Sequence, residues 1–536
     1  MTSTFHGLEI GKRALFAQQA GLNTVGQNVA NANTPGYSRQ RVDLVATPSM
    51  EYPGLAKSTQ AGQLGTGVTV VSIERIRDSF LDAQYRNENK TSGEWEVRQN
   101  ALDKLQAIFN EPSDTGLSKV LTNFYTSWQT LGRNPDSLEA RSVVKQATLD
   151  LANTLNTMDA KLSELDSDLR DDAGTKVMEI NQYTSQIVDL NKQIKTLEVL
   201  GDKANDLRDR RDYLVDLLSK AADTTAKELP DGTYQVSIGS TMVVDGVNPP
   251  VVLAYDSTTN TVNPPVVGGE LGGMQASISQ YVSIYRDQLN SLVNGLVNGK
   301  IDATLPNSYT FDSTVTTLPF DVKLANGTTM KQGDAIPAGY TIPAGSMITF
   351  NGLNGMHQFG FTMQKPTTQA GPLFETSDGS TTFTAGNIRL SKAITDDVRN
   401  LAASYTTYQD SSNNTQVKVG NGDVAFMLGE ANSAKIDFKN GLPPNSAILT
   451  TGTVSDYMRA MIGQLGSQAQ AADRQVKNQD TLLMQIDNQR QSISGVSIDE
   501  EMANMIKFQQ SYGAAARLVN TIDGMLDIII NRLMSN

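Results

Sequence analysis

The chain has no cysteine and only two histidines, His6 and His357, among its 536 residues. The absence of cysteine excludes disulfide bonds and thiolate chemistry. The sequence also lacks a paired Cys/His cluster, an HExxH motif, a Gly-x-Ser-x-Gly elbow and a phosphate-binding P-loop. We therefore expect no enzyme, no cofactor and no metal site, although the two carboxylates of a glycosidase would leave no readable pattern.

Long apolar runs and basic blocks are missing as well. No stretch reaches the length of about 20 apolar residues that a transmembrane helix needs. The segment Met1–Leu8 has no basic region ahead of an apolar core, so no secretory signal peptide is visible. The formal net charge is −13 and aromatic residues make up 6% of the chain. We expect neither nucleic acid nor a membrane as a partner.

The pattern along the chain predicts an α+β multidomain protein with helical ends and a β-rich middle. Apolar and polar residues alternate in parts of 38–75, which predicts a long β-hairpin or loop. Residues 76–222 read as helical, with breaks near 112–113 and 134–136 and separate helices over 137–169 and 177–200. From about 222 to 387 Gly, Pro, Thr and Val dominate, with one helix over 272–297. Helix returns near Asp396 and again over 454–494.

This order predicts nested, discontinuous domains, because the simplest packing brings the two ends together. We expect an inner domain of paired terminal helices (1–37 and 497–536) and a mainly helical shoulder domain (38–222 and 388–496) with the hairpin at 38–75. An outer β-rich domain with one helix (223–300) and an inserted β-rich module (301–387) would project from them.

Both ends carry apolar residues at coiled-coil spacing. In the N-terminal segment the stripe recurs every seven residues: Leu8, Leu15, Leu22 and Val29. The C-terminal helix begins at a capping box, Ser497 to Glu500. Its seam alternates steps of four and three and includes Met502, Met505, Tyr512, Val519, Leu526 and Leu533. The C-terminal seam is apolar enough to require a helical partner, and the N-terminal helix is the simplest one. Taken alone, the seam would also suit a core helix of a soluble helical bundle.

A polar turn follows the first helix, in the run Asn28-Val-Ala-Asn-Ala-Asn33-Thr34-Pro35-Gly36-Tyr37-Ser38-Arg39-Gln40. Pro35 presets φ and Gly36 suits the following position of a type II turn. The helix should therefore stop near Asn31. We take Asn33, Pro35, Gly36 and Tyr37 as candidate assembly residues together with the two seams.

This run resembles the N-terminal motif of the bacterial flagellar axial proteins: rod, hook and hook-associated proteins. The Ser38-Arg39-Gln40 ending is similar to the hook-associated protein 1 family, and so are Gln509, Tyr512, Ala514 and Ala516 near the other end. The charged segment 204–218 resembles that family's Leu-x-Asp-x-Arg-Asp-x-Leu-Val segment. Taken alone, such a mixed charge run is more typical of a solvated helix face.

The resemblance implies a structural component at the hook–filament junction that self-assembles into a tubular layer through its terminal helices. It further implies the hook protein and hook-associated protein 3 as neighbours, and an export chaperone at the C-terminal helix. The protein would be extracellular, exported by the flagellar type III route without a cleaved signal. The alternatives are a hook or rod protein and, more remotely, a secreted β-rich adhesin or polysaccharide hydrolase.

Overall fold

The computed structural model describes residues 5–49, 65–111, 113, 116–412, 414–439 and 447–528. The chain forms two compact units, each built from separated stretches. Unit 1 comprises Met1–Glu96, Ala173–Gly273 and Gln475–Asn536, and unit 2 comprises Val97–Asp172 and Met274–Arg474. The predicted α+β class is confirmed, while the four predicted domain ranges stay a prediction.

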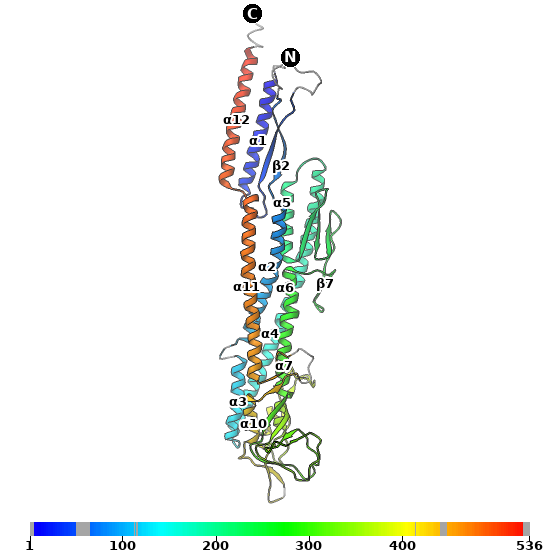
Figure 1. Ribbon diagram of the computed structural model, residues 1–536, viewed down its shortest axis with the longest axis vertical. Coiled ribbons are helices and arrows are strands. Elements are labelled where there is room, and N and C mark those ends of the chain that lie inside the picture. The colour runs from blue at the N-terminus through cyan, green and yellow to red at the C-terminus, as the bar shows by residue number, and fades with distance from the viewer. Residues whose placement is uncertain are drawn as a thin grey trace. The chain divides into compact units, whose positions relative to one another are not determined.

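Unit 1 contains the paired chain ends. Helix α1 (His6–Ala30) lies alongside α12 (Ile498–Asp527), as Figure 1 shows in blue and red. The prediction of paired terminal helices is confirmed. The long helix α11 (Val454–Ser494) ends directly before α12, with Ser497 as the N-cap of α12. The cap forms because Ser497 accepts a hydrogen bond from the Glu500 amide, which satisfies one of the free amides of the first turn.

The hairpin predicted after the turn is present. Strand β1 (Gln40–Ala46) pairs antiparallel with β2 (Val68–Arg75), with one irregularity between Asp43 and Leu44. Much of the connection between the strands, residues 50–64, lies outside the described residues. The hairpin packs on α1.

Four helices follow: α2 (Ser79–Phe109), α3 (Leu117–Arg133), α4 (Leu138–Glu198) and α5 (Asn205–Ala221). The breaks between α2, α3 and α4 fall where Pro112 and Pro135 predicted them. The predicted break between residues 169 and 177 is wrong, because α4 is one helix of 61 residues. A lone Gly174 costs about 1 kcal/mol in a helix, and ion pairs from Arg170 to Asp166 and from Lys176 to Glu179 support the helix on either side.

The β-rich part of unit 1 is small. Strands β3 (Thr224–Glu228), β4 (Tyr234–Ile238) and β5 (Thr241–Asp245) form an antiparallel sheet, and β6 (Ala254–Asp256) pairs with β7 (Thr261–Asn263). The helix predicted over 272–297 is present as α6 (Gly269–Ala276), a π-helical turn (Ser277–Val282) and α7 (Ser283–Asn298).

Unit 2 holds a six-stranded sheet in the order β11-β10-β13-β8-β18-β19. Its strands are β8 (Lys300–Thr304), β10 (Val322–Lys323), β11 (Thr329–Met330), β13 (Met347–Asn351), β18 (Ile436–Asp437) and β19 (Thr451–Gly452). The sheet of the predicted 301–387 module therefore continues into strands from later in the chain.

The remaining elements of unit 2 are short. They are β9 (Tyr309–Thr310), β12 (Thr341–Ile342), α8 (Gly352–Gln358), β14 (Phe374–Thr376), β15 (Ile388–Leu390), α9 (Lys392–Asp396), β16 (Thr407–Gln409), β17 (Thr415–Val417) and α10 (Asp423–Glu430). The helix predicted near Asp396 amounts only to α9. Helix α11 matches its predicted range of 454–494. Across the described residues, no helix has the length and apolarity to cross a bilayer.

His357 lies at the centre of the unit 2 core. Its ring is fully buried and meets Trp128 edge-on at 6.2 Å between ring centroids. Nε2 accepts a hydrogen bond from the Ala402 amide (2.9 Å), so the ring proton sits on Nδ1 and is donated to the Gly371 carbonyl (2.7 Å). Burial, and to a smaller degree the Arg141 guanidinium, lowers the pKa of His357 to about 4, although the Gly371 bond favours the charged form.

The first prediction concerns the stability of unit 2 at acidic pH. Below pH 6.5 the unfolded chain protonates this histidine while the folded chain does not, so stability should fall as the pH drops from 6.5 to about 4. The loss should be about 3 kcal/mol in the free energy of unfolding of unit 2. Urea denaturation of His357→Gln should lack this part of the pH dependence, whereas His6→Gln should retain it. Equal slopes in the two variants would refute the assignment.

Candidate functional site

The turn after α1 has the predicted geometry. The helix ends at Ala30 with Asn31 as C-cap, and the Tyr37 amide donates to the Thr34 carbonyl at 3.2 Å. Gly36 has φ +78°, as the third position of a type II turn requires. A Cβ on Gly36 would also lie 2.7 Å from the Cβ of Tyr213 on α5. Glycine is therefore required here both by the turn and by the close approach of α5.

Asn28 holds the two ends of this turn together. Its buried amide makes four hydrogen bonds, which use every donor and acceptor that it carries. Oδ1 accepts from the Gln40 amide and from the Tyr37 hydroxyl, while Nδ2 donates to the Gln40 carbonyl and to the Glu501 carboxylate, all at 2.9 Å. Asn28 thus joins α1, the start of β1 and the start of α12.

Arg39 ties the same motif to the C-terminal helix. Its guanidinium lies 2.8 Å from the buried Glu501 carboxylate and 2.7 Å from Glu500, and its backbone amide donates to the Ser494 carbonyl at the end of α11. The Glu500 side chain of the predicted capping box is therefore paired with Arg39. Residues from opposite ends of the chain meet at this point.

Beside the turn lies a cluster of buried charges that we call the ionic junction. Its cations are Arg75 at the end of β2, Arg77 two residues later, Arg86 of α2 and Arg490 of α11. Its anions are Asp82 of α2 and Asp209, Asp212 and Asp216 of α5. Asp209, Asp212 and Asp216 of α5 are buried. The reading of segment 204–218 as a solvated helix face is therefore wrong, because charges of both signs from other elements cover that face.

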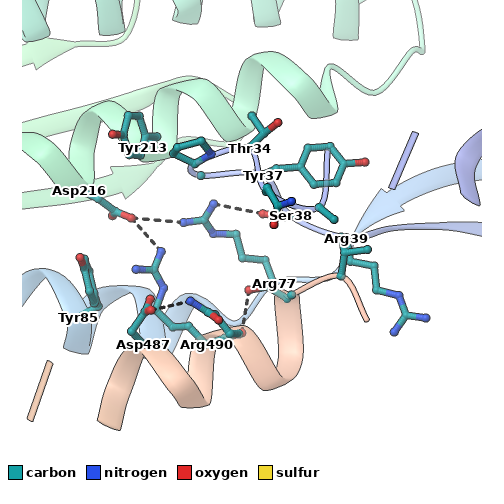
Figure 2. A pocket seen from close by; sticks show the side chains of 18 of the residues that line it. Thr34, Tyr37, Ser38, Arg39, Arg77, Tyr85, Tyr213, Asp216, Asp487 and Arg490 are labelled. Atoms are coloured by element: carbon teal, nitrogen blue, oxygen red, sulfur yellow. Dashed lines mark hydrogen bonds and ion pairs between the residues drawn. The ribbon is translucent and has the colours of Figure 1, made fainter. Parts of the chain in front are cut away.

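The pairing in the ionic junction is dense. Asp212 faces Arg75 at 2.9 Å and Arg77 at 3.3 Å, and it accepts a hydrogen bond from the Tyr234 hydroxyl at 2.6 Å. Asp216 lies 2.6 Å from the Nε of Arg86 and 2.8 Å from Arg490. Figure 2 shows Arg77 and Arg490 both pointing toward Asp216.

Burial disfavours the charged form of Asp212, but the surrounding guanidinium groups outweigh it and hold its pKa well below the usual range. Asp209 differs, since burial dominates there and raises its pKa despite its contact with Arg75. Asp209 also accepts the backbone amide of Ser38 at 3.0 Å, which attaches the motif to α5. The ionic junction is thus the anchor by which the N-terminal motif joins the helices of unit 1.

A cavity of about 880 Å³ opens between the turn, α2, α5 and the end of α11. It is lined on one side by residues 32–39 with Tyr213 of α5 beside them, and across from them by side chains that include Tyr85 and Asp487 (Figure 2). Its arginines are already paired with carboxylates. Among the described residues no group of three potential metal ligands occurs, and the cavity offers no nucleophile paired with a base.

Helices α1 and α12 meet through small residues. A Cβ on Gly11 would lie 2.6 Å from Val519, and one on Gly21 would lie 2.6 Å from the Phe508 ring. The predicted N-terminal stripe, Leu8, Leu15, Leu22 and Val29, is half-buried, and the fully buried residues of α1 are Gly11, Ala17, Gly21, Thr24, Val25 and Asn28. The helices therefore approach more closely than leucine-on-leucine packing would allow.

The predicted C-terminal seam is largely open to solvent. Val519 contacts α1; Met505 and Leu526 are half-buried, while Met502 and Tyr512 are exposed, and Leu533 lies outside the described residues. In the turn, Asn33, Pro35 and Gly36 are exposed and Tyr37 is half-buried. Only three residues of α12 are buried: Glu501, Ala515 and Ile522.

Sequence reasoning missed the residues that join these parts. They are Asn28, Arg39, Gln40 and Glu501 around the turn, and the arginines and aspartates of the ionic junction. Asn28 and Gln40 are the first and last residues of the recognised motif, and the alternating charges of 204–218 can be read from the sequence. No local pattern, however, says that a charge on α5 faces arginines 130 or more residues away in the chain.

Comparison with known proteins gives consistent matches. Residues 102–300 match the flagellar hook-associated protein FlgK helical domain. Residues 488–533 match the flagellar basal body rod FlgEFG protein C-terminal family, and residues 8–37 match the flagella basal body rod protein family.

Whole-chain relatives have the same description. The chain is 36% identical to flagellar hook-associated protein 1 of Bacillus subtilis (strain 168), covering 99% of both chains. It is 27% identical to that of Salmonella typhimurium, covering 96% of this chain and 98% of the relative. In fold it resembles the flagellar hook junction protein FlgK of Burkholderia pseudomallei, with a TM-score of 0.51 and 16% identity over 77% of this chain and 100% of that one.

The second prediction tests the ionic junction. Asp212→Asn removes the charge that faces three guanidinium groups and should cost about 3–5 kcal/mol of stability, because it leaves buried cations unpaired. Chemical denaturation of unit 1 measures this. Asp189→Asn, which breaks the exposed Lys192–Asp189 pair of the same unit, is the matched control and should leave the denaturation curve unchanged. Similar curves for both variants would show that the ionic junction does not hold unit 1.

The third prediction tests the close approach of α1 and α12. Gly21→Ala should loosen the pair by about 1–3 kcal/mol, since its Cβ meets the Phe508 ring. Gly26→Ala on the same helix has no atom within 4 Å of the new Cβ and should be neutral or stabilising. Amide hydrogen exchange in α1 should be faster in the first variant only. Equal exchange rates in both variants would contradict this packing.

Proposed function

Because the chain belongs to the flagellar hook-associated protein 1 family, we propose that it forms the junction between hook and filament by assembling with copies of itself into a tubular layer. The protein is a structural component of the flagellum, and its family is not a family of enzymes. The proposal concerns how this chain carries out that role, which residues make the contacts and which neighbours they meet.

One observation carries the assembly proposal: α12 is an amphipathic helix with too little covered surface. Large apolar side chains on it remain 38–56% exposed, namely Ile498, Met502, Ile506, Tyr512, Leu518, Met525 and Ile528. Phe5, the N-cap of α1, and Phe16 within α1 are also more than half exposed. Several large apolar side chains exposed along one helix are typical of an interaction site. Because about half of each such side chain is already covered, burial of the rest would contribute about 1 kcal/mol per residue.

In a tubular assembly these exposed residues would be covered by neighbouring copies. One face of α12 is used by α1, and the flanking faces would contact the terminal helices of neighbouring copies. The seam residues Met502, Met505, Tyr512, Val519 and Leu526, the N-terminal stripe and the exposed turn at Asn33–Gly36 are the proposed assembly residues. The ionic junction would then hold each terminal pair at a fixed angle to its own helices.

Its neighbours would be the hook protein on one side and hook-associated protein 3 on the other. We further propose that the apolar seam of α12 binds an export chaperone before assembly, because the same surface would otherwise be exposed. Export would follow the flagellar type III route, without a cleaved signal, to the extracellular flagellum. The predicted four-domain division would place the terminal helices innermost and the β-rich parts outermost.

A hook or rod protein is the second candidate, favoured by the rod-type matches at residues 8–37 and 488–533. Against it stand the match of residues 102–300 to the FlgK helical domain and the identity over the whole chain. Nothing among the described residues favours the adhesin or hydrolase alternative.

The fourth prediction tests the function. A deletion strain should be non-motile and secrete unpolymerised flagellin, and the wild-type gene should restore filaments. Leu526→Asp places a charge in the seam and should not restore motility, although the outer domains stay folded. Asn520→Asp adds the same charge at an exposed polar position and should restore it. Filaments with Leu526→Asp would refute the role of the seam, and filaments in the deletion strain would refute the function.

A further inference from the structure

The connection between α4 and α5 carries an exposed apolar tip. Val199 and Leu200 are 78% and 77% exposed. Their backbone is nevertheless ordered, because the amides of residues 199, 200 and 201 donate to carbonyls of the last turn of α4. Glu198 at its base binds Arg208 through both carboxylate oxygens, at 2.6 and 2.7 Å. A fixed turn thus presents two adjacent apolar side chains to solvent, where they contribute nothing to the fold of unit 1.

Charged residues follow this tip directly. Asp202 and Lys203 are exposed. The apolar side chains of Val199 and Leu200 therefore have one negative and one positive side chain next to them. We call residues 199–203 the α4 tip.

Unit 2 has a groove of matching character. It has a volume of about 370 Å³ and lies between the N-terminal ends of α3 and α11. Leu121, Val454, Met458 and Ile462 supply its apolar lining. Glu111 and Arg459 line it as well. The carboxylate of Glu111 is fixed by the Ser118 amide at 2.8 Å. The side chain of Arg459 is 79% exposed and lies 3.6 Å from the carboxylate of Asp456, which is itself 49% exposed.

We propose that the groove of one copy receives the α4 tip of a second copy. Leu200 and Val199 would cover the apolar lining, Asp202 would face Arg459, and Lys203 would face Glu111. In this arrangement the charges are opposite in sign at both rims, and the apolar tip enters an apolar groove. Two tips facing each other could also pair their charges, but neither would then enter the groove.

The contact joins two different surfaces of the same chain, so it is heterologous and repeats from copy to copy. A repeating contact of this kind extends an assembly instead of closing it as a dimer. The inference rests on the proposed self-assembly, but it uses a surface outside the terminal helices. It can therefore fail while the proposed function stands.

Cysteine cross-linking tests the contact sharply, since the chain has no cysteine of its own. Leu200→Cys combined with Ile462→Cys is expressed in the deletion strain, and hook–filament junctions are isolated and oxidised. Non-reducing electrophoresis should give a ladder of cross-linked copies. The matched control is Val252→Cys with Ile462→Cys, because Val252 is 71% exposed in unit 1 but lies outside the tip; it should stay monomeric.

Three outcomes with the double-cysteine chain would overturn the proposal. They are a monomer that assembles and restores motility without cross-linking, a disulfide within one chain, and a cross-link to a different protein through a native cysteine of that protein. Loss of assembly in the wild-type chain would instead refute the proposed function. Leu200→Cys alone should give no dimer, and a dimer from that variant would indicate tip-to-tip contact and also contradict the proposal.

Charge reversal in the same double-cysteine chain gives a second measurement that does not depend on folding. Asp202→Arg should lower the rate of cross-linking about two- to fivefold, because exposed ion pairs contribute modestly. Arg459→Asp should do the same. The two changes together should restore the original rate, since the opposite charges would then face each other again. Equal rates in all four chains would remove the charge pairing from the proposal.

Discussion

Burial of Asp209, Asp212 and Asp216 on α5 is the constraint on which the rest of unit 1 depends. Asp212 is 1% exposed and Asp209 is 4% exposed, so each must face compensating charge. Arginines from β2, α2 and α11 supply that charge, and this requirement fixes where those elements lie around α5. The N-terminal motif then joins the same cluster through the Ser38 amide and through Arg39 on Glu501.

This arrangement explains why residues in and beside this short turn are tightly constrained by the fold. Asn28 and Gly36 have little freedom to change, one because all of its hydrogen-bonding groups are used and the other because α5 approaches it closely. The exposed part of the turn, around Asn33 and Pro35, has no such task within the chain. Its proposed task is contact with other copies, as for the uncovered faces of α12.

Two kinds of surface are therefore combined in one molecule. The internal contact between α1 and α12 is close and uses glycines, and it buries only Glu501, Ala515 and Ile522 of α12, so the larger apolar side chains of α12 stay uncovered. A monomer with broad leucine packing at that point would bury its seam against itself. A chain that assembles needs the opposite arrangement, with a small internal contact and apolar surface available to neighbours.

The sequence by itself determined the type and most of the limits of the helices, the turn at Thr34–Tyr37, the capping box at Ser497 and the family. These are local features, set by backbone preferences over a few residues. Two predictions from the sequence were wrong. A break was expected within α4, where ion pairs on either side of Gly174 support a continuous helix, and the charges of α5 were expected to face solvent. Only the tertiary structure decided which face of each terminal helix is buried and which charges meet. Those contacts join residues more than a hundred positions apart, and no local spacing encodes such a pairing.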